Sequence, residues 1–135
     1  MKTIKDKYIW KGKKILIVED DETGFIYLKE LLRYTGVKII HAIDGSEAIN
    51  EIKVNPNTDL IIMDIYLPRL DGITATKIIK KINKNILVIA ITAAQETSLF
   101  NKDIAANAGC DEYFSKPFDG KTFLSMIDQY FKKQA

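Results

Sequence analysis

Short runs of apolar residues alternate along the chain with longer segments in which apolar and polar residues are mixed. The apolar runs cover residues 15–18, 37–40, 60–63 and 86–91, and a shorter one covers 113–114. Nearly continuous runs of β-branched and other aliphatic residues are typical of strands that are buried on both faces. Such strands, separated by helical segments, predict a parallel sheet covered by helices.

The segments between the runs repeat apolar residues at the spacing of one helix face. The repeats are Phe25/Leu28/Leu31/Leu32, Ala48/Ile49/Ile52, Ile78/Ile79/Ile82 and, most regularly, Phe123/Leu124/Ile127/Tyr130/Phe131. A weaker pattern predicts another helix over residues 97–107, and Asp44 is placed to cap the second helix with Glu47 reaching back. Five strand–helix units with right-handed crossovers give a doubly wound α/β sheet.

Composition supports one ordinary globular domain. The 135 residues are 47% hydrophobic and 28% charged, and no apolar run approaches the roughly 20 residues of a membrane span. We therefore expect a cytoplasmic domain without membrane contact. The single cysteine, Cys110, can form no internal disulfide and fits a small packed hydrophobe in a reducing compartment.

Charge divides the chain into two parts. The first 14 residues hold six lysines against one aspartate, a net charge of +5, which leaves −3 for the remainder of a chain whose total is +2. We interpret residues 1–12 as a leader or the end of a linker and residues 13–133 as the folded domain. Because no basic stripe with interleaved aromatics follows, we expect no nucleic-acid binding by this domain.

The residues that follow the predicted strands are the most informative part of the sequence. Glu19 and Asp20 follow the first strand, Asp64 ends the third, Thr92 ends the fourth and Lys116 comes just after the fifth. Ligands of open α/β sheets bind at the carboxyl ends of the strands, so these side chains are expected to meet at one edge. Asp21, by contrast, is readily explained as a helix cap.

Three carboxylates at one edge repel one another unless a cation neutralises them, and oxygen ligands of this kind suit Mg²⁺. A lone lysine beside them would be a simple salt bridge. Together with the Thr92 hydroxyl, however, Lys116 completes a site for the oxygens of a phosphoryl group. The nucleophile would then be the Asp64 carboxylate, and its product an acyl phosphate.

Four motifs, in this order, resemble the receiver domain of two-component response regulators. They are Ile-Leu-Ile-Val-Glu-Asp-Asp at 15–21, Met-Asp-Ile-Tyr-Leu-Pro with Asp-Gly at 63–72, Thr-Ala at 92–93 and Lys-Pro-Phe at 116–118. The resemblance runs from about residue 13 to 131. It implies a flavodoxin-like, five-stranded parallel sheet in the order 2-1-3-4-5 with five flanking helices.

The resemblance also implies roles for the residues. Asp64 would accept a phosphoryl group from a phosphohistidine in a Mg²⁺-dependent reaction. Asp20, with Glu19 and Asp64 and the main-chain carbonyl of Tyr66, would bind the metal. The remaining roles are phosphoryl binding by Thr92 and Lys116, conformational switching by Thr92 and Tyr113, and a cis peptide bond between Lys116 and Pro117.

Partners follow from the same resemblance. A histidine kinase or a histidine phosphotransfer domain would donate the phosphoryl group, and the face made by the fourth helix, fifth strand and fifth helix is a candidate homodimer surface. The segment with Trp10 shortly before Gly-Lys-Lys-Ile-Leu-Ile-Val-Glu-Asp resembles the start of receivers that are fused behind a histidine-kinase ATPase module. A stand-alone receiver is the alternative, with Trp10 as an incidental packing residue.

Two other classes fit less well. A haloacid-dehalogenase-like phosphatase with an aspartyl-phosphate intermediate needs a second Asp two residues after the nucleophile, where this chain has Tyr66. A degenerate receiver or flavodoxin-type binder should lack part of the acidic and lysine set or carry a phosphate-binding glycine loop. We therefore expect a phosphoacceptor switch, not a free-standing enzyme, in which Tyr66 shields the acyl phosphate from water.

Overall fold

The computed structural model describes residues 8–93, 97 and 100–134. Five parallel strands form one sheet in the order β2-β1-β3-β4-β5, which confirms the predicted topology. The strands are β1 (Lys14–Val18), β2 (Lys38–Ala42), β3 (Leu60–Asp64), β4 (Leu87–Thr92) and β5 (Glu112–Ser115). The helices are α1 (Glu22–Leu32), α2 (Gly45–Val54), α3 (Gly72–Ile82), α4 (Lys102–Ala108) and α5 (Gly120–Lys133).

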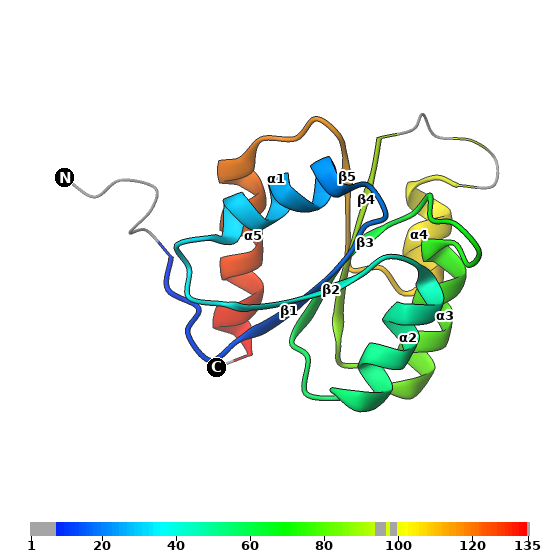
Figure 1. Ribbon diagram of the computed structural model, residues 1–135, viewed down its shortest axis with the longest axis horizontal. Helices are drawn as coiled ribbons and strands as arrows, with labels where there is room; N and C mark the ends of the chain where they lie inside the picture. Colours follow the sequence, from blue (N-terminus) through cyan, green and yellow to red (C-terminus); the bar gives the residue numbers. More distant parts are fainter. Residues whose placement is uncertain (1–7, 94–96, 98–99, 135) are drawn as a thin grey trace.

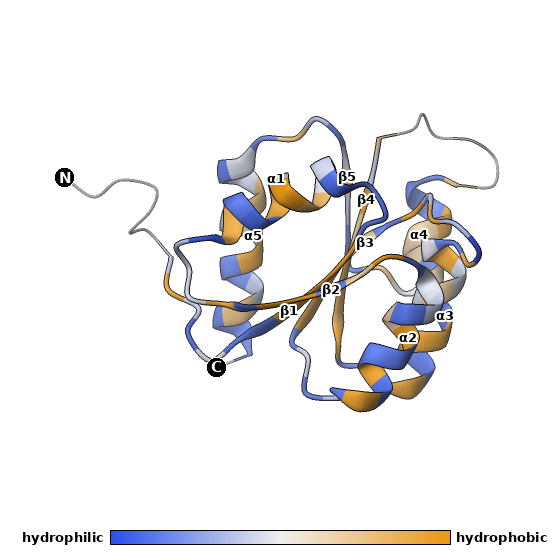
Figure 2. Cartoon of the chain, in the orientation of Figure 1, coloured by the Kyte–Doolittle hydropathy of each residue, from blue (hydrophilic) through white to orange (hydrophobic). Residues whose placement is uncertain are grey.

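Helices cover both faces of the sheet (Figure 1). Helices α1 and α5 lie on one face, and α2, α3 and α4 lie on the other. Successive residues of a strand point to opposite faces, so Ile15 and Ile17 pack toward α1 and α5, whereas Leu16 and Val18 pack toward α2 and α3. Figure 2 shows the central strands as mostly hydrophobic, between helices that carry both hydrophobic and hydrophilic residues.

Strand β2 and helix α4 differ from their predicted bounds in ways that the structure explains. Strand β2 begins one residue later than the apolar run at 37–40, since its pairing with β1 starts at Lys38. It also ends later, because His41 and Ala42 continue the pairing with β1. The helix expected over 97–107 begins only at Lys102, where the Asn101 side chain accepts a hydrogen bond from the Ile104 amide at 2.9 Å. Residues 98–99 of that prediction lie outside the described residues.

The segment before β1 packs against the domain from Tyr8 onward. Trp10 is only 3% exposed, and its indole Nε1 donates a hydrogen bond to Asp128 of α5 at 2.9 Å. Its ring meets Phe131 edge-on and stacks with Tyr8. Residues 1–7 of the leader interpretation lie outside the described part of the chain.

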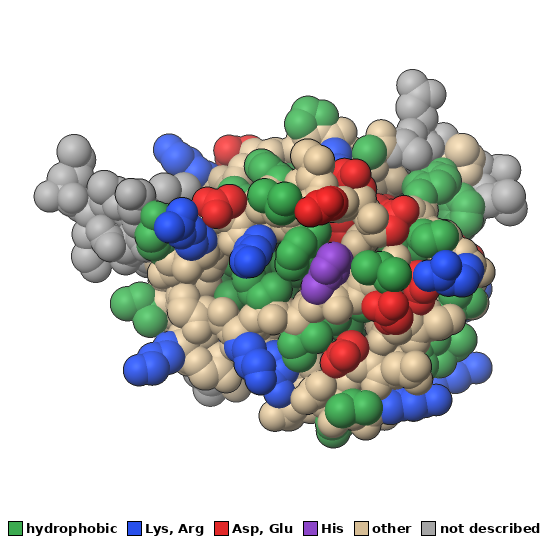
Figure 3. Space-filling model, in the orientation of Figure 1, with side chains coloured by type: hydrophobic (Ala, Val, Ile, Leu, Met, Phe, Trp, Pro, Cys, Tyr) green, Lys and Arg blue, Asp and Glu red, His purple; other side chains and the backbone are tan. Residues whose placement is uncertain are grey.

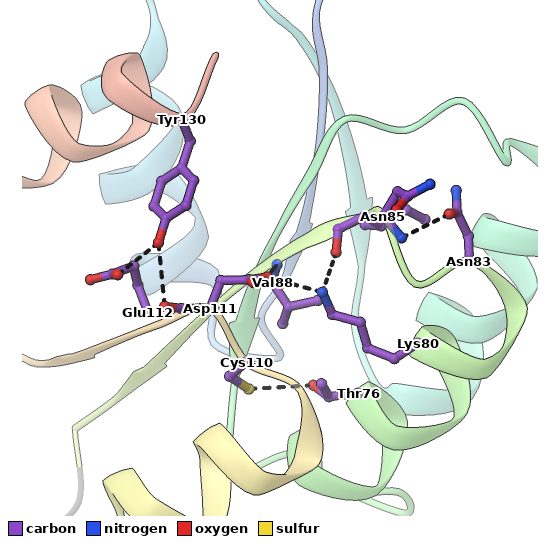
Figure 4. Close-up of polar contacts among 10 residues, drawn as sticks. Thr76, Lys80, Asn83, Asn85, Val88, Cys110, Asp111, Glu112 and Tyr130 are labelled. Atoms are coloured by element: carbon purple, nitrogen blue, oxygen red, sulfur yellow. Dashed lines mark hydrogen bonds and ion pairs between the residues drawn. The ribbon is translucent and has the colours of Figure 1, made fainter. Parts of the chain in front are cut away.

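A polar network holds the edge of the sheet opposite the predicted site (Figure 4). The Lys80 ammonium of α3 contacts the Asp111 carboxylate at 3.0 Å, and the same carboxylate accepts a hydrogen bond from the Val88 amide. Close by, the Cys110 thiol lies 3.8 Å from the Thr76 hydroxyl, and burial raises the pKa of Cys110 to about 11. A thiol in this environment is a structural side chain, as the sequence indicated.

Candidate functional site

Three carboxylates converge at the carboxyl edge of the sheet. β1 and β3 are neighbours with Val18 opposite Met63, so Glu19 and Asp20 emerge beside Asp64. Their carboxylate oxygens lie within 4.8 Å of one another. Glu19 and Asp64 are buried, at 1% and 7% exposure, whereas Asp20 is exposed. The predicted juxtaposition of the three acids is therefore present.

Lys116 and Thr92 lie at the same edge. The Lys116 ammonium contacts a Glu19 carboxylate oxygen at 2.9 Å. The Lys116 amide donates a hydrogen bond to the Thr92 carbonyl at 2.7 Å, which ties the loop after β5 to the buried end of β4. The peptide bond between Lys116 and Pro117 is cis, as predicted. In this structure the lysine charge thus lies against Glu19.

Burial and like charge dominate the electrostatics of Asp64. Desolvation, followed by the hydrogen bond and the charge of Glu19, raises the pKa of Asp64 to about 7, although Lys116 and the Tyr66 amide act in the opposite direction. Burial and the neighbouring carboxylate thus disfavour the charged form of Asp64, and a bound cation would favour it. Because all donors are carboxylate oxygens and Asp20 opens to solvent, the set fits a hard, partly hydrated cation such as Mg²⁺.

Asp21 has a different role from its two acidic neighbours. Its carboxylate accepts a hydrogen bond from the Gly24 amide at 2.9 Å and so forms the N-cap of α1. The Asp21 amide in turn donates to the Glu19 carboxylate at 3.2 Å. The sequence-based interpretation of Asp21 as a helix cap is confirmed.

Tyr66 lies beside the phosphoacceptor candidate. Its amide donates a hydrogen bond to an Asp64 carboxylate oxygen at 3.0 Å, and its ring contacts Phe100 with 4.8 Å between centroids. The Tyr66 side chain is 38% exposed. The contact with Phe100 was not foreseen, because Phe100 precedes α4 and belongs to no apolar repeat. Metal binding by the Tyr66 carbonyl stays a prediction.

Close backbone packing explains the glycine of the Asp71-Gly72 pair. The Gly72 amide donates to the Ile65 carbonyl at 2.9 Å, and a Cβ at this residue would lie 2.2 Å from the Asp64 carbonyl oxygen. Any larger residue would have to push the end of β3 away from the start of α3. Gly72 therefore holds the main chain of Asp64 close to that helix.

An ion pair that the sequence did not reveal fixes the β3–α3 loop. Arg69 Nε donates a hydrogen bond to the Asp44 carboxylate at 2.9 Å, and Arg69 Nη2 donates to the same oxygen. Arg69 adopts a left-handed backbone conformation with φ of 63°. Asp44 was expected only to cap α2, which it does through the Glu47 amide at 2.8 Å. Nothing in the spacing of Asp44 and Arg69 marks them as partners.

Asp44→Ala is expected to lower the free energy of unfolding by about 1–2 kcal/mol, because it removes both the cap and the arginine contact. Asp44→Asn, which can still cap, should cost less than about 1 kcal/mol. The Glu47 amide and Arg69 lower the pKa of Asp44 below 3.8, so this stabilisation is complete above that pH and is lost as the pH falls through the folded-state pKa. Urea unfolding of both variants across acidic pH measures this; equal losses in both would contradict it.

The two residues predicted to switch, Thr92 and Tyr113, lie on neighbouring strands. Thr92 pairs with Ser115, and Tyr113 pairs with Ala90. Tyr113 packs against a cluster that includes Ile65, and both it and Thr92 take part in further contacts. The predicted movement of Thr92 and Tyr113 is not tested by a single conformation and stays a prediction.

Comparison with known proteins places this chain in a family. Residues 15–128 match the family model described as the response regulator receiver domain. The chain is 32% identical over 120 residues to the polar-differentiation response regulator DivK of Brucella anthropi, covering 87% of this chain and 95% of DivK. It is 38% identical over 122 residues to hybrid signal transduction histidine kinase G of Dictyostelium discoideum, covering 87% of this chain but only 4% of that kinase.

One solved structure is similar to the chain in both fold and sequence. The CheX-CheY-BeF3-Mg complex from Borrelia burgdorferi includes a chain that superposes with a TM-score of 0.80 and 31% identity, covering 90% of each. None of the described helices combines the length and apolar character needed to cross a membrane.

Proposed function

The chain belongs to the response regulator receiver family, and from that premise we propose that Asp64 accepts a phosphoryl group from a phosphohistidine. The observation that carries this proposal is the buried Asp64 carboxylate, which lies within 4.8 Å of the Glu19 and Asp20 oxygens at the edge that also holds Lys116. Burying two of three clustered carboxylates beside a lysine lowers stability, whereas the same arrangement suits charge neutralisation around a phosphoryl group.

Glu19, Asp20 and Asp64, together with the Tyr66 carbonyl, would hold Mg²⁺. Bound there, the ion supplies the positive charge that offsets the carboxylates and the phosphoryl oxygens. The Borrelia structure, whose description includes Mg and BeF3, supports this assignment. Ionised Asp64 is the form that can react, and both Lys116 and the Tyr66 amide favour it.

The transfer itself needs little from the protein beyond position and charge. An oxygen of Asp64 bonds to phosphorus while the phosphorus–nitrogen bond of the donor breaks, and the imidazole nitrogen released takes up a proton. Lys116, now paired with Glu19, is close enough to the cluster to turn toward a phosphoryl oxygen. Thr92 would bind another oxygen of the group.

The readout and partners follow from this assignment. Thr92 and Tyr113 would respond together and alter the face made by α4, β5 and α5, which would bind effectors or a second copy of the chain. The donor would be a histidine kinase or a histidine phosphotransfer domain. Similarity to hybrid kinase G supports a receiver inside a kinase chain, and similarity to DivK along almost its whole length supports a stand-alone regulator. Either setting would be cytoplasmic.

Incubation with acetyl phosphate tests the proposal without a cognate kinase. We expect the intact mass of the protein to rise by one phosphoryl group in the presence of Mg²⁺ and not in its absence. Asp64→Asn should show no adduct, whereas the helix-cap variant Asp21→Asn should be labelled like wild type. An unmodified wild-type protein, or equal labelling of Asp64→Asn, would refute the assignment.

Tyr66→Asn is expected to shorten the lifetime of the acyl phosphate several-fold, up to about tenfold, which corresponds to about 1.4 kcal/mol in the barrier. The reason is the proposed shielding by Tyr66, whose amide bonds to the Asp64 carboxylate and whose ring contacts Phe100. Phosphate release from the labelled protein is the measurement, with Tyr66→Phe as the control that keeps the ring. Release at the wild-type rate from Tyr66→Asn would contradict the shielding role.

A further inference from the structure

His41, the chain's only histidine, lies next to the acidic edge but belongs to none of the motifs above. It is exposed in β2, opposite Ile17 of β1, and its ring Nε2 lies 2.8 Å from the main-chain carbonyl oxygen of Glu19. Figure 3 shows the histidine at the surface with several acidic side chains gathered beside it. A carbonyl oxygen can only accept, so Nε2 must carry the proton in this contact.

The histidine ring is held on its face as well as at its edge. It stacks on Phe25 of α1, with centroids 3.7 Å apart and planes 8° from parallel. Phe25 is itself placed by its amide, which donates to the Asp21 carbonyl at 3.0 Å. His41 therefore joins β2, the end of β1 and the first turn of α1.

With this contact, both main-chain polar groups of Glu19 are bonded to β2. The Glu19 amide donates to the Ala42 carbonyl at 3.0 Å, and the Glu19 carbonyl accepts from His41. The carbonyl of Glu19 and the amide of Asp20 share one rigid peptide plane. The His41 bond thus fixes the plane from which the Asp20 side chain projects.

The orientation of this peptide plane matters because the side chains of the three acids are anchored differently. The Glu19 carboxylate is held by Lys116 and the Asp21 amide, and the Asp64 carboxylate by the Tyr66 amide. Within the described part of the chain, no hydrogen bond or ion pair holds the Asp20 carboxylate. Its direction is therefore set by the main chain.

We propose that His41 is a positioning residue of the metal site, acting through its Nε2–H bond to the Glu19 carbonyl to aim Asp20 at the cation. The inference rests on the proposed function, because it assigns the acidic cluster to Mg²⁺. Residues that orient a metal ligand without touching the metal typically change metal affinity by about 10–100-fold when they are removed. Since His41 acts through the main chain, we expect the lower end of that range.

Two variants separate the hydrogen bond from the stacking. His41→Phe keeps a ring over Phe25 and loses the donor, and we expect the Mg²⁺ dissociation constant to rise about tenfold. His41→Gln retains an amide donor of similar reach and should stay within about threefold of wild type. The measurement is a Mg²⁺ titration followed by the NMR shifts of the Asp20 and Asp21 amides. Unchanged affinity in His41→Phe, or equal losses in both variants, would overturn the proposal.

A second readout needs no metal. At a pH where the ring is neutral, ¹⁵N NMR should find His41 in the Nε2–H tautomer, and His41→Phe should speed hydrogen exchange at the Asp20 amide several-fold. If wild type bound no Mg²⁺, the proposed function would fail, and these two observations would still decide whether His41 orders the loop. The Nδ1–H tautomer, or unchanged exchange at Asp20, would contradict the role.

Discussion

In metal-free buffer at pH about 8, Asp64→Asn is expected to be more stable than wild type by about 1–2 kcal/mol. Burial and Glu19 raise the pKa of Asp64 from 3.8 to about 7. Between these values the folded protein keeps a proton that the unfolded chain releases, so the free energy of unfolding of wild type falls as the pH rises. Above pH about 7 the charge on Asp64 destabilises the folded state fully. Solvent at the open side of the cluster limits the size of this destabilisation. Asparagine removes the charge and with it the destabilisation.

Urea unfolding at several pH values measures this effect. The advantage of Asp64→Asn should be small near pH 3.8 and grow toward neutrality. Saturating Mg²⁺ should reduce or reverse it, because binding to the folded state stabilises wild type. Asp21→Asn is the matched control, since asparagine caps a helix about as well as aspartate and should give no comparable gain. A pH-independent difference between Asp64→Asn and wild type would contradict the electrostatic explanation.

Trp10→Ala is expected to lower the free energy of unfolding by about 3–5 kcal/mol, the usual cost of emptying the site of a buried large aromatic. Trp10 is almost fully buried among residues such as Leu32 and Phe131, and its indole N–H is bonded to Asp128. A loss of this size is a large part of the 5–15 kcal/mol that stabilises a typical domain. The segment before β1 would then be essential to stability.

Chemical denaturation of three variants tests the role of this segment. Ile9→Ala changes the adjacent residue, which is 78% exposed, and should have an effect within about 0.5 kcal/mol. Trp10→Phe keeps much of the apolar contact but loses the bond to Asp128, so an intermediate loss is expected. If Trp10→Ala were as mild as Ile9→Ala, the packing of this segment would contribute nothing to the folded state.

Periodicity and strand-end position were sufficient to predict most of the fold and the central acids. The apolar run ending at Asp64 could only be a strand buried on both faces, and parallel strands place their carboxyl ends at one edge. That rule put Glu19, Asp20 and Asp64 at one edge, and the strand order implied by the family resemblance made their strands neighbours. The start of α4 was harder, because it depends on the Asn101 cap and not on an apolar repeat.

Contacts between elements were beyond the sequence pattern. Trp10 lies 118 positions from Asp128, and no period connects them. The Asp44–Arg69 and His41–Glu19 contacts depend on how far particular side chains reach once the sheet and loops have formed. Periodicity reports which face a residue occupies, whereas such pairs are decided by three-dimensional distance.

The identity of the residue that carries the phosphoryl group is the most direct test of the central claim. Acyl phosphates are reduced by borohydride, which converts a phosphorylated aspartate into homoserine. After labelling with acetyl phosphate and Mg²⁺, reduction and peptide mass spectrometry should find homoserine at position 64 alone. Homoserine at position 20 or 21, or at no position in a labelled protein, would contradict Asp64 as the phosphoacceptor.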